Sequence, residues 1–152
     1  MTGLIPRDPA FADKVAQSFA RQPFMSTLKA RLVSVAPGRV EVAVDNWPGL
    51  QQQHGYVHAG VTTTLLDNAC GYAAISLKPA GIEVLTIELK VNLLNPGRGE
   101  QLVAVGQVLK DGRQVTVVQA DAYGVQSDGS RVHVATMLAS MMAFDLARAG
   151  QS

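Results

Sequence analysis

The chain has 152 residues, enough for one domain with a sizeable core, and 47% of them are hydrophobic. Its formal net charge of +1 provides no basic excess of the kind that a nucleic-acid-binding surface needs. No basic segment followed by an apolar core opens the sequence, and the single cysteine, Cys70, cannot form an internal disulfide. These features predict a cytoplasmic protein with no secretory signal, in which Cys70 is a small buried hydrophobic residue.

The first third of the chain predicts one helix and two strands. Apolar residues at helical spacing predict a short amphipathic helix at about 9–21, ended by Gln22-Pro23. A strand is expected over residues 28–35, and the strict alternation of residues 39–45 is the best strand signal in the sequence. Pro37-Gly38 predicts a tight turn between these strands.

The longest apolar stretch, residues 59–77, contains a single charge, Asp67. Its length is marginal for a membrane span, and its three threonines and Asn68 favour a packed central helix instead. Four strands joined mostly by tight turns are expected after this helix, over residues 83–94, 101–109, 114–126 and 130–144. In the first of these four, alternation predicts one apolar face made of Leu85, Ile87, Leu89, Val91 and Leu93.

One long helix among turn-linked strands excludes repeated βαβ units. A helix that is apolar nearly all round has to be enclosed by other elements. The sequence therefore predicts a single α+β domain, residues 1–152, in which a curved antiparallel sheet of about six strands wraps around the central helix.

Residues with useful chemistry gather where a polar loop meets the central helix. Gln52 and His58 belong to the loop, Ala59 begins the helix and Asp67 follows two turns later. The first N–H groups of a helix have no intrahelical acceptor, so the Ala59 N–H could polarise a carbonyl while Asp67 acts as a base. The helix face around Asp67 carries residues small enough to leave space for substrate or water: Gly60, Thr63, Thr64 and Gly71.

Each of these residues also has an ordinary structural interpretation. Asp67 could be bonded to the nearby threonine hydroxyls or across a subunit interface, and Gln52, one of three consecutive glutamines, could be a solvated loop amide. His58 could be the N-terminal cap of the helix, a residue that orders the loop, or a polar member of a site. His54 and His58 do not stand in metalloprotease order, so no metal site is predicted.

The combination of Gln52, His58-Ala59-Gly60 and Asp67 resembles the hotdog-fold PaaI-like acyl-CoA thioesterases, and is similar also to the 4-hydroxybenzoyl-CoA thioesterases of that fold. The family pattern is Asn or Gln, then His-Gly-Gly six residues later, then Asp or Glu nine residues after the His. Positions 52, 58 and 67 meet both spacings, and Ala59 replaces the first glycine. The resemblance covers about residues 24–144. It implies a hotdog fold and hydrolysis of an acyl-CoA thioester with no metal or redox cofactor.

The resemblance also implies roles for individual residues. Asp67 would activate a water or, as the less favoured route, attack the thioester itself, while the Ala59 N–H and Gln52 polarise the carbonyl. Thr86 matches a position whose hydroxyl helps to orient the attacking water. Substrate contacts are expected from Gly60 and Tyr56, and the phosphates of coenzyme A are expected to meet basic residues among Lys90, Arg98, Lys110 and Arg113.

The family further implies a homodimer, plausibly a dimer of dimers, with two central helices side by side. Asp67 of one subunit would then face Gln52 and Ala59 of the other. A hotdog dehydratase or hydratase is an alternative, because His58 and Asp67 could mimic its His and acidic residue, although at a different spacing. A non-catalytic acyl-CoA sensor is another, but sensors of this fold carry a DNA-binding segment, for which the helix at 9–21 is too short. Phenylacetyl, hydroxybenzoyl and medium-chain acyl groups are all compatible with the sequence.

Overall fold

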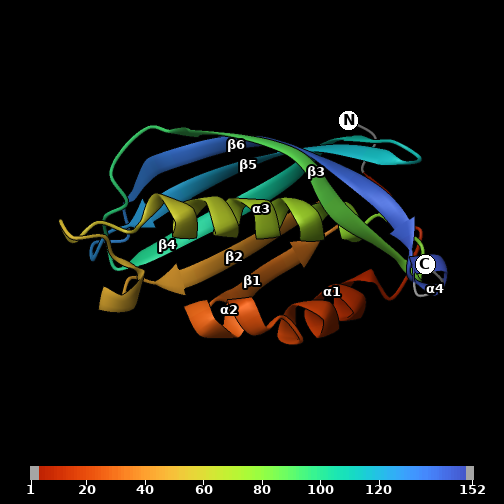
Figure 1. Ribbon diagram of the computed structural model, residues 1–152, viewed down its shortest axis with the longest axis horizontal. Helices are drawn as coiled ribbons and strands as arrows, with labels where there is room; N and C mark the ends of the chain where they lie inside the picture. The colour runs from red at the N-terminus through yellow and green to blue at the C-terminus, as the bar shows by residue number, and fades with distance from the viewer. Residues whose placement is uncertain (1–3, 150–152) are drawn as a thin grey trace.

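The computed structural model describes residues 4–149, so residues 1–3 and 150–152 of the expected single domain lie outside it. One antiparallel sheet curves around the long helix α3 (Ala59–Ile75), in the strand order β1-β2-β4-β5-β6-β3 (Figure 1). The strands are β1 Arg31–Ala36, β2 Arg39–Asp45, β3 Ile82–Leu93, β4 Gln101–Asp111, β5 Val115–Val125 and β6 Arg131–Asp145. The short helices are α1 Phe11–Ala20, α2 Pro23–Leu28, the 3-10 helix η1 Pro48–Leu50 and α4 Leu146–Ala149. The predicted α+β architecture of six strands around one central helix is confirmed.

The region before β1 differs from the prediction by one helix. Pro23 was expected only to end a helix, but it begins α2, because the first helical position does not need the N–H that proline lacks. Lys29 ends α2 in the left-handed conformation, with φ of 59°. The first strand consequently begins at Arg31 instead of residue 28.

Helix α3 lies in the concave face of the sheet because most of its side chains are apolar. Leu65, Leu66, Ala69 and Cys70 are fully buried in the core that α3 shares with the strands. Burial raises the pKa of the Cys70 thiol, which suits the predicted inert hydrophobic role. Gly106 of β4 permits the close packing, since a Cβ there would lie 2.4 Å from the Ala69 carbonyl oxygen. Within residues 4–149, no helix has the length and apolar character needed to cross a bilayer.

Strand β3 contains a β-bulge that the sequence pattern did not reveal. Thr86 lies opposite Met141 of β6, whereas Glu88 lies opposite Ser140, so Ile87 is an extra residue with no partner of its own. One extra residue reverses which side chains point toward α3 from that point onward. Before the bulge Thr86 faces the helix, and it contacts the buried Met141 on that side.

The prediction of a single apolar face along β3 is therefore wrong for Leu85. Leu85 lies opposite the exposed Met142 and is itself 61% exposed. After the bulge, Leu89 and Leu93 lie opposite buried alanines of β6 and face the helix side. Both still have large exposed fractions because β3 is the edge strand and nothing in the described chain covers it.

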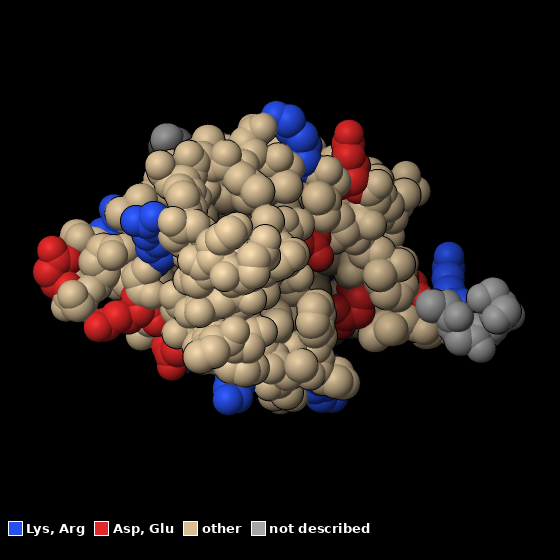
Figure 2. Space-filling view, turned by 60° about the vertical axis from the view of Figure 1, so that its left-hand side comes forward, with Lys and Arg blue, Asp and Glu red and all other residues tan. Residues whose placement is uncertain are grey.

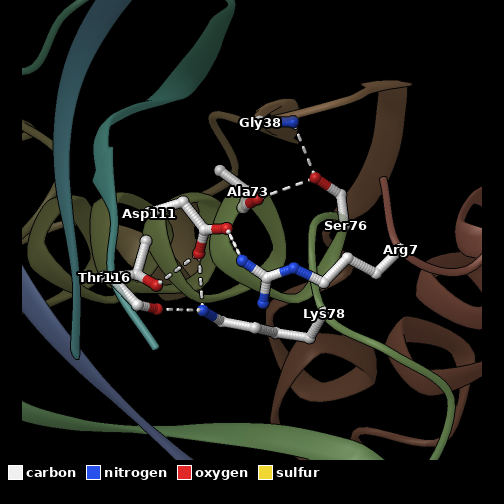
Figure 3. A network of polar contacts seen from close by, with 8 residues as sticks. Arg7, Gly38, Ala73, Ser76, Lys78, Asp111 and Thr116 are labelled. Atoms are coloured by element: carbon white, nitrogen blue, oxygen red, sulfur yellow. Dashed lines mark hydrogen bonds and ion pairs between the residues drawn. The ribbon is translucent and has the colours of Figure 1, made fainter. Parts of the chain in front are cut away.

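A closed polar network follows the last turn of α3 (Figure 3). Lys78 is only 1% exposed, and its Nζ donates to Asp111 Oδ1 at 2.6 Å and to the Gly112 carbonyl at 3.0 Å. Asp111 also accepts hydrogen bonds from Arg7 at 2.7 Å and Thr116 at 3.1 Å. The network joins the N-terminal segment, the end of α3 and the β4–β5 hairpin, and it leaves the buried ammonium fully compensated.

Candidate active site

A cavity of about 480 Å³ lies beside the start of α3. Residues of the preceding loop and of the loop after β3 line it together, and two backbone hydrogen bonds fix these loops. The Val57 N–H donates to the Gly97 carbonyl at 2.9 Å, and the His58 N–H donates to the Leu50 carbonyl at 2.8 Å. Four of the predicted site residues line this cavity: Gln52, Tyr56, His58 and Ala59.

His58 is the N-terminal cap of α3. Its Nδ1 accepts a hydrogen bond from the Gly60 N–H at 2.9 Å, and its extended backbone is typical of a capping residue. The capping interpretation of His58 is therefore confirmed, and the Gly60 N–H is already used. The Ala59 N–H finds no acceptor among residues 4–149. It is a free donor at the positive end of the helix dipole, as an oxyanion-stabilising group must be.

The side-chain amide of Gln52 is held by its own loop. Its Oε1 accepts from the His54 N–H, while its backbone N–H donates to the Tyr56 carbonyl at 2.9 Å. Because the oxygen is engaged, the Nε2 group is the end of the amide that remains free among the described residues, and Gln52 lines the cavity. The amide is thus oriented as a donor.

The two neighbouring glutamines differ from Gln52 in their contacts. The Gln51 Nε2 donates to Asn46 Oδ1 at 3.0 Å, which ties the loop to the end of β2. Gln53 is exposed on the loop and also lines the cavity. Geometry therefore separates three side chains that are chemically identical in the sequence.

Asp67 lies eight residues further along α3 than Ala59, about 12 Å along the helix axis at 1.5 Å per residue. It is half-buried on the stripe that the sheet does not cover, and its Oδ1 accepts a hydrogen bond from the Thr86 hydroxyl at 2.7 Å. The bulge in β3 makes this contact possible, because it keeps Thr86 on the helix side of the strand. Thr63 and Thr64 donate to backbone carbonyls of α3 instead, so they are not the structural partners of Asp67.

A second cavity, of about 250 Å³, lies beside Asp67 between α1, α3 and β3. Gln22 orders its wall: its Nε2 donates to the Tyr72 hydroxyl at 2.8 Å, and its Oε1 accepts from Asn68 Nδ2 at 2.9 Å. Ser18 shares a 3.2 Å hydrogen bond with the Tyr72 hydroxyl. Burial raises the pKa of Tyr72, although the hydrogen bonds from Ser18 and Gln22 act in the opposite direction. The Tyr72 hydroxyl therefore stays protonated at neutral pH.

Within one chain, the predicted residues form two separate groups. Gln52, His58 and Ala59 share the cavity at the start of α3, and Asp67 with Thr86 borders the cavity toward its C-terminal half. Figure 2 shows one face of the molecule that is largely uncharged, with acidic atoms lying in hollows. The residues predicted to act as base and as carbonyl-polarising donors thus line separate cavities and do not meet in a single copy of the chain.

Comparison with known proteins identifies the family. Residues 54–128 match the thioesterase superfamily. The crystal structure of a thioesterase family protein from Silicibacter pomeroyi is 50% identical, covers 89% of this chain and 98% of that chain, and superposes with a TM-score of 0.86. The chain belongs to the thioesterase superfamily.

Two further relatives support the sequence resemblance. Human acyl-coenzyme A thioesterase 13 is 29% identical over 98 residues, which cover 61% of this chain and 66% of that enzyme. The chain thus spans slightly less than two thirds of this curated relative. The structure of the Escherichia coli PaaI protein, 21% identical, covers 88% of this chain and 96% of that chain with a TM-score of 0.75. This likeness confirms the predicted hotdog fold.

The region that matches the thioesterase superfamily includes His58, Ala59, Asp67 and Thr86. It does not include α1 or α2, so Ser18 and Gln22, which line the Asp67 cavity, were missed by motif-based prediction. The sequence carries little signal for this pair, because Ser18 belongs to α1, which ends at Ala20, whereas Gln22 is the N-cap residue of α2.

The basic residues proposed for coenzyme A occupy three places in this superfamily member. The Arg98 guanidinium lies over the Tyr56 ring, 4.6 Å from its centroid, and donates to the Tyr56 hydroxyl beside the larger cavity. Lys90 is on the outer side of β3, where it donates to Asn92 at 2.8 Å. Lys110 and Arg113 are exposed at the β4–β5 hairpin, beyond the opposite end of α3.

Proposed function

We propose that this chain hydrolyses acyl-CoA thioesters to a free carboxylic acid and coenzyme A. The arrangement of α3 supports this most strongly: a carboxylate fixed by the Thr86 hydroxyl stands on the uncovered face of the same helix whose first N–H is free. The spacing of Gln52, His58 and Asp67 and the acyl-CoA thioesterase among the relatives agree with it.

The chemistry follows from these groups. The thioester oxygen accepts hydrogen bonds from the Ala59 N–H and Gln52 Nε2, which stabilise the negative charge that develops during attack. Asp67 takes a proton from a water molecule while the water oxygen bonds to the acyl carbon. Collapse of the tetrahedral intermediate breaks the C–S bond, and the proton held by Asp67 passes to the leaving sulfur. Thr86 keeps the carboxylate oriented throughout.

The site is proposed to form between two chains. Asp67 and Ala59 are about 12 Å apart along one helix, too far to act on the same carbonyl. Two α3 helices packed antiparallel, with Asp67 opposite the partner's Ala59, would cross near Thr63, midway between these positions. The uncovered edge of β3, with exposed Leu89 and Leu93, gives such a dimer a surface to bury.

The same antiparallel arrangement suggests how coenzyme A is held. Arg98 lies beside the cavity that would accept the thioester end, and the partner's hairpin with Lys110 and Arg113 would come toward that end of the molecule. Their charges would then meet the phosphates of coenzyme A. A dimer of dimers and a contribution from Lys90 or Gly60 remain proposals of the same kind.

The alternatives fit the contacts less well. A dehydratase needs a His and an acidic residue acting together, but the Nδ1 of His58 is already used to cap α3. An acyl-CoA sensor needs no base, yet Asp67 is held by a dedicated hydroxyl.

The test uses two variants that each disable one half of the site. Ala59→Pro removes only the N–H, because proline is well accepted at the first helical position and His58 already has the backbone angles that precede proline. Loss of this donor should lower kcat by about 10²–10³. Asp67→Asn removes the base, and Ala59→Ser, which keeps the N–H, is the control for Ala59→Pro.

Thiol release is then measured after the two inactive variants are unfolded together and refolded. A site shared between subunits predicts recovery of about one quarter of wild-type activity, because half of the random dimers contain one intact site. No recovery would contradict the two-chain site. No thiol release by the wild-type chain from any acyl-CoA would contradict the proposed reaction.

A further inference from the structure

The cavity beside Asp67 has the position of an acyl subsite, provided that the proposed function holds. If the thioester carbonyl lies between Asp67 and the partner's Ala59, the acyl group must continue into space that adjoins Asp67. The cavity of about 250 Å³ between α1, α3 and β3 adjoins it directly. Its volume equals that of roughly eight water molecules at about 30 Å³ each, so it suits a compact acyl group.

Gly71 keeps this cavity wide. Glycine in the interior of a helix is destabilising relative to alanine, and Gly71 stands inside α3, one turn after Asp67 and one turn before the helix ends at Ile75. No packing contact in the described chain requires it: an added Cβ would meet no atom within 4 Å, in contrast to Gly106. The space above Gly71 is part of the cavity.

The charged side chains that line this cavity are acidic. Asp67 and Glu83 both line it, and among the described lining residues there is no lysine or arginine. Lys14 lies near Glu83, but its Nζ donates to the carbonyls of Pro79 at 2.9 Å and Ile82 at 2.8 Å, and it is not a lining residue. These two carboxylates would repel a substrate whose acyl group carries a carboxylate of its own at the far end.

The rest of the wall is uncharged, and it combines polar side chains with the apolar Ile75, Val84 and Leu85. Tyr72 and Ser18 supply hydroxyls, and Gln22 supplies an amide. Asn68 adds a buried Oδ1 that has no hydrogen-bond partner in the described part of the chain. Walls of this kind favour an acyl group that carries a hydrogen-bond donor over one that is purely aliphatic.

We infer that the cavity between α1, α3 and β3 is the acyl subsite, and that it selects compact, uncharged acyl groups bearing a hydroxyl. Gly71 sets its width, Glu83 sets its charge, and the Tyr72 hydroxyl contributes its polarity.

The substrates for the test share one chain length. Hexanoyl-CoA, 6-hydroxyhexanoyl-CoA and adipoyl-CoA differ only at the far end of a six-carbon acyl group, and acetyl-CoA is too short to reach into the cavity. The wild-type chain should prefer 6-hydroxyhexanoyl-CoA to hexanoyl-CoA by about tenfold in kcat/KM and should disfavour adipoyl-CoA by about tenfold or more. Tyr72→Phe should reduce the first preference without changing the second.

Two variants test width and charge separately. Gly71→Ala should raise Tm, because alanine favours the helix and meets no clash, yet it should lower kcat/KM for the six-carbon substrates about tenfold more than kcat/KM for acetyl-CoA. Glu83→Gln should raise the adipoyl-to-hexanoyl ratio of kcat/KM about tenfold. Glu88→Gln is its matched control, because Glu88 belongs to the same strand but contacts Ser140 on the outer face.

The outcomes separate this inference from the proposed function. Thiol release with equal kcat/KM for all three six-carbon substrates, or Gly71→Ala with unchanged kcat/KM for them, would overturn the subsite while the thioesterase activity stands. Equal effects of Glu83→Gln and Glu88→Gln would also overturn it. Absence of thiol release from acetyl-CoA and from every other thioester would overturn the proposed function itself, and the subsite with it.

Discussion

The two ends of helix α3 differ in whether the polar groups near them have partners within the protein. At the C-terminal end, Lys78 is buried and its charge is met by Asp111, which is shared with Arg7 and Thr116 (Figure 3). At the N-terminal end, the Ala59 N–H has no acceptor in the described chain and opens onto a cavity of about 480 Å³. One end has its polar groups satisfied by the protein, and the other keeps a donor free.

This difference separates stability from function along a single helix. A buried and fully paired charge holds elements together but has nothing left to offer a substrate. A free N–H at a helix start is slightly unfavourable in the empty protein, and it becomes useful when a developing negative charge arrives. Asp67 lies between these extremes, since Thr86 holds one carboxylate oxygen while the cavity side stays open.

Asp67→Asn should show the largest effect, and it should affect only activity. The amide is nearly isosteric and can still accept the hydrogen bond from Thr86, but it cannot take a proton from water. We expect kcat for thioester hydrolysis to fall by about 10²–10⁴. Thermal unfolding should show an unchanged Tm, and acyl-CoA binding should persist. Near-normal turnover by a folded Asp67→Asn protein would defeat the assignment of Asp67 as the base.

Asp111→Asn should show the reverse pattern. It leaves the charge of Lys78, which is 1% exposed, without its counter-charge, so we expect the free energy of unfolding to fall by about 3–5 kcal/mol. Urea titration measures this, and kcat at saturating substrate should be unchanged below the unfolding transition. Asp45→Asn is the control, because its ion pair with Arg31 is exposed and should contribute less than about 1 kcal/mol. Equal losses in the free energy of unfolding for both variants would contradict the expectation that the buried Lys78 makes its ion pair more important for stability than an exposed one.

The sequence predicted most of the fold because its signals were local and consistent. Alternating strands, glycine-containing turns and one apolar helix placed every strand of the sheet to within a few residues. Prediction was wrong where a residue type has two uses or where the pattern hides an insertion. Pro23 can end one helix or begin another. Ile87, the extra residue of the bulge in β3, fits the alternation of apolar residues in the sequence, so the pattern does not reveal the bulge.

The candidate site was predictable only in part, for a related reason. The spacing of Gln52, His58 and Asp67 marks a local motif, so it could be found in the sequence. Gln22 lies between α1 and α2, and it reaches the Asp67 cavity through hydrogen bonds to Asn68 and Tyr72, which are more than forty residues away in the sequence. No short motif encodes such a contact, because it depends on how α1 packs against α3.

The smallest expected effect distinguishes Gln52 from its neighbours at the N-terminal end. Gln52→Ala removes one of two donors to the thioester oxygen, and the Ala59 N–H remains, so the loss in kcat should stay below the ~3–4 kcal/mol upper value for a lost oxyanion donor. Because the contact strengthens as the tetrahedral intermediate forms, kcat should fall more than KM rises.

Gln51→Ala and Gln53→Ala provide matched controls with different expectations. Gln53 is exposed, so its loss should be close to neutral. Gln51 donates to Asn46, so its replacement should lower Tm slightly and change kcat less than Gln52→Ala does. Comparable losses of kcat in all three variants would mean that this segment provides loop order instead of oxyanion contact. A loss confined to Gln53 would place the donor one residue further along, on the same cavity wall.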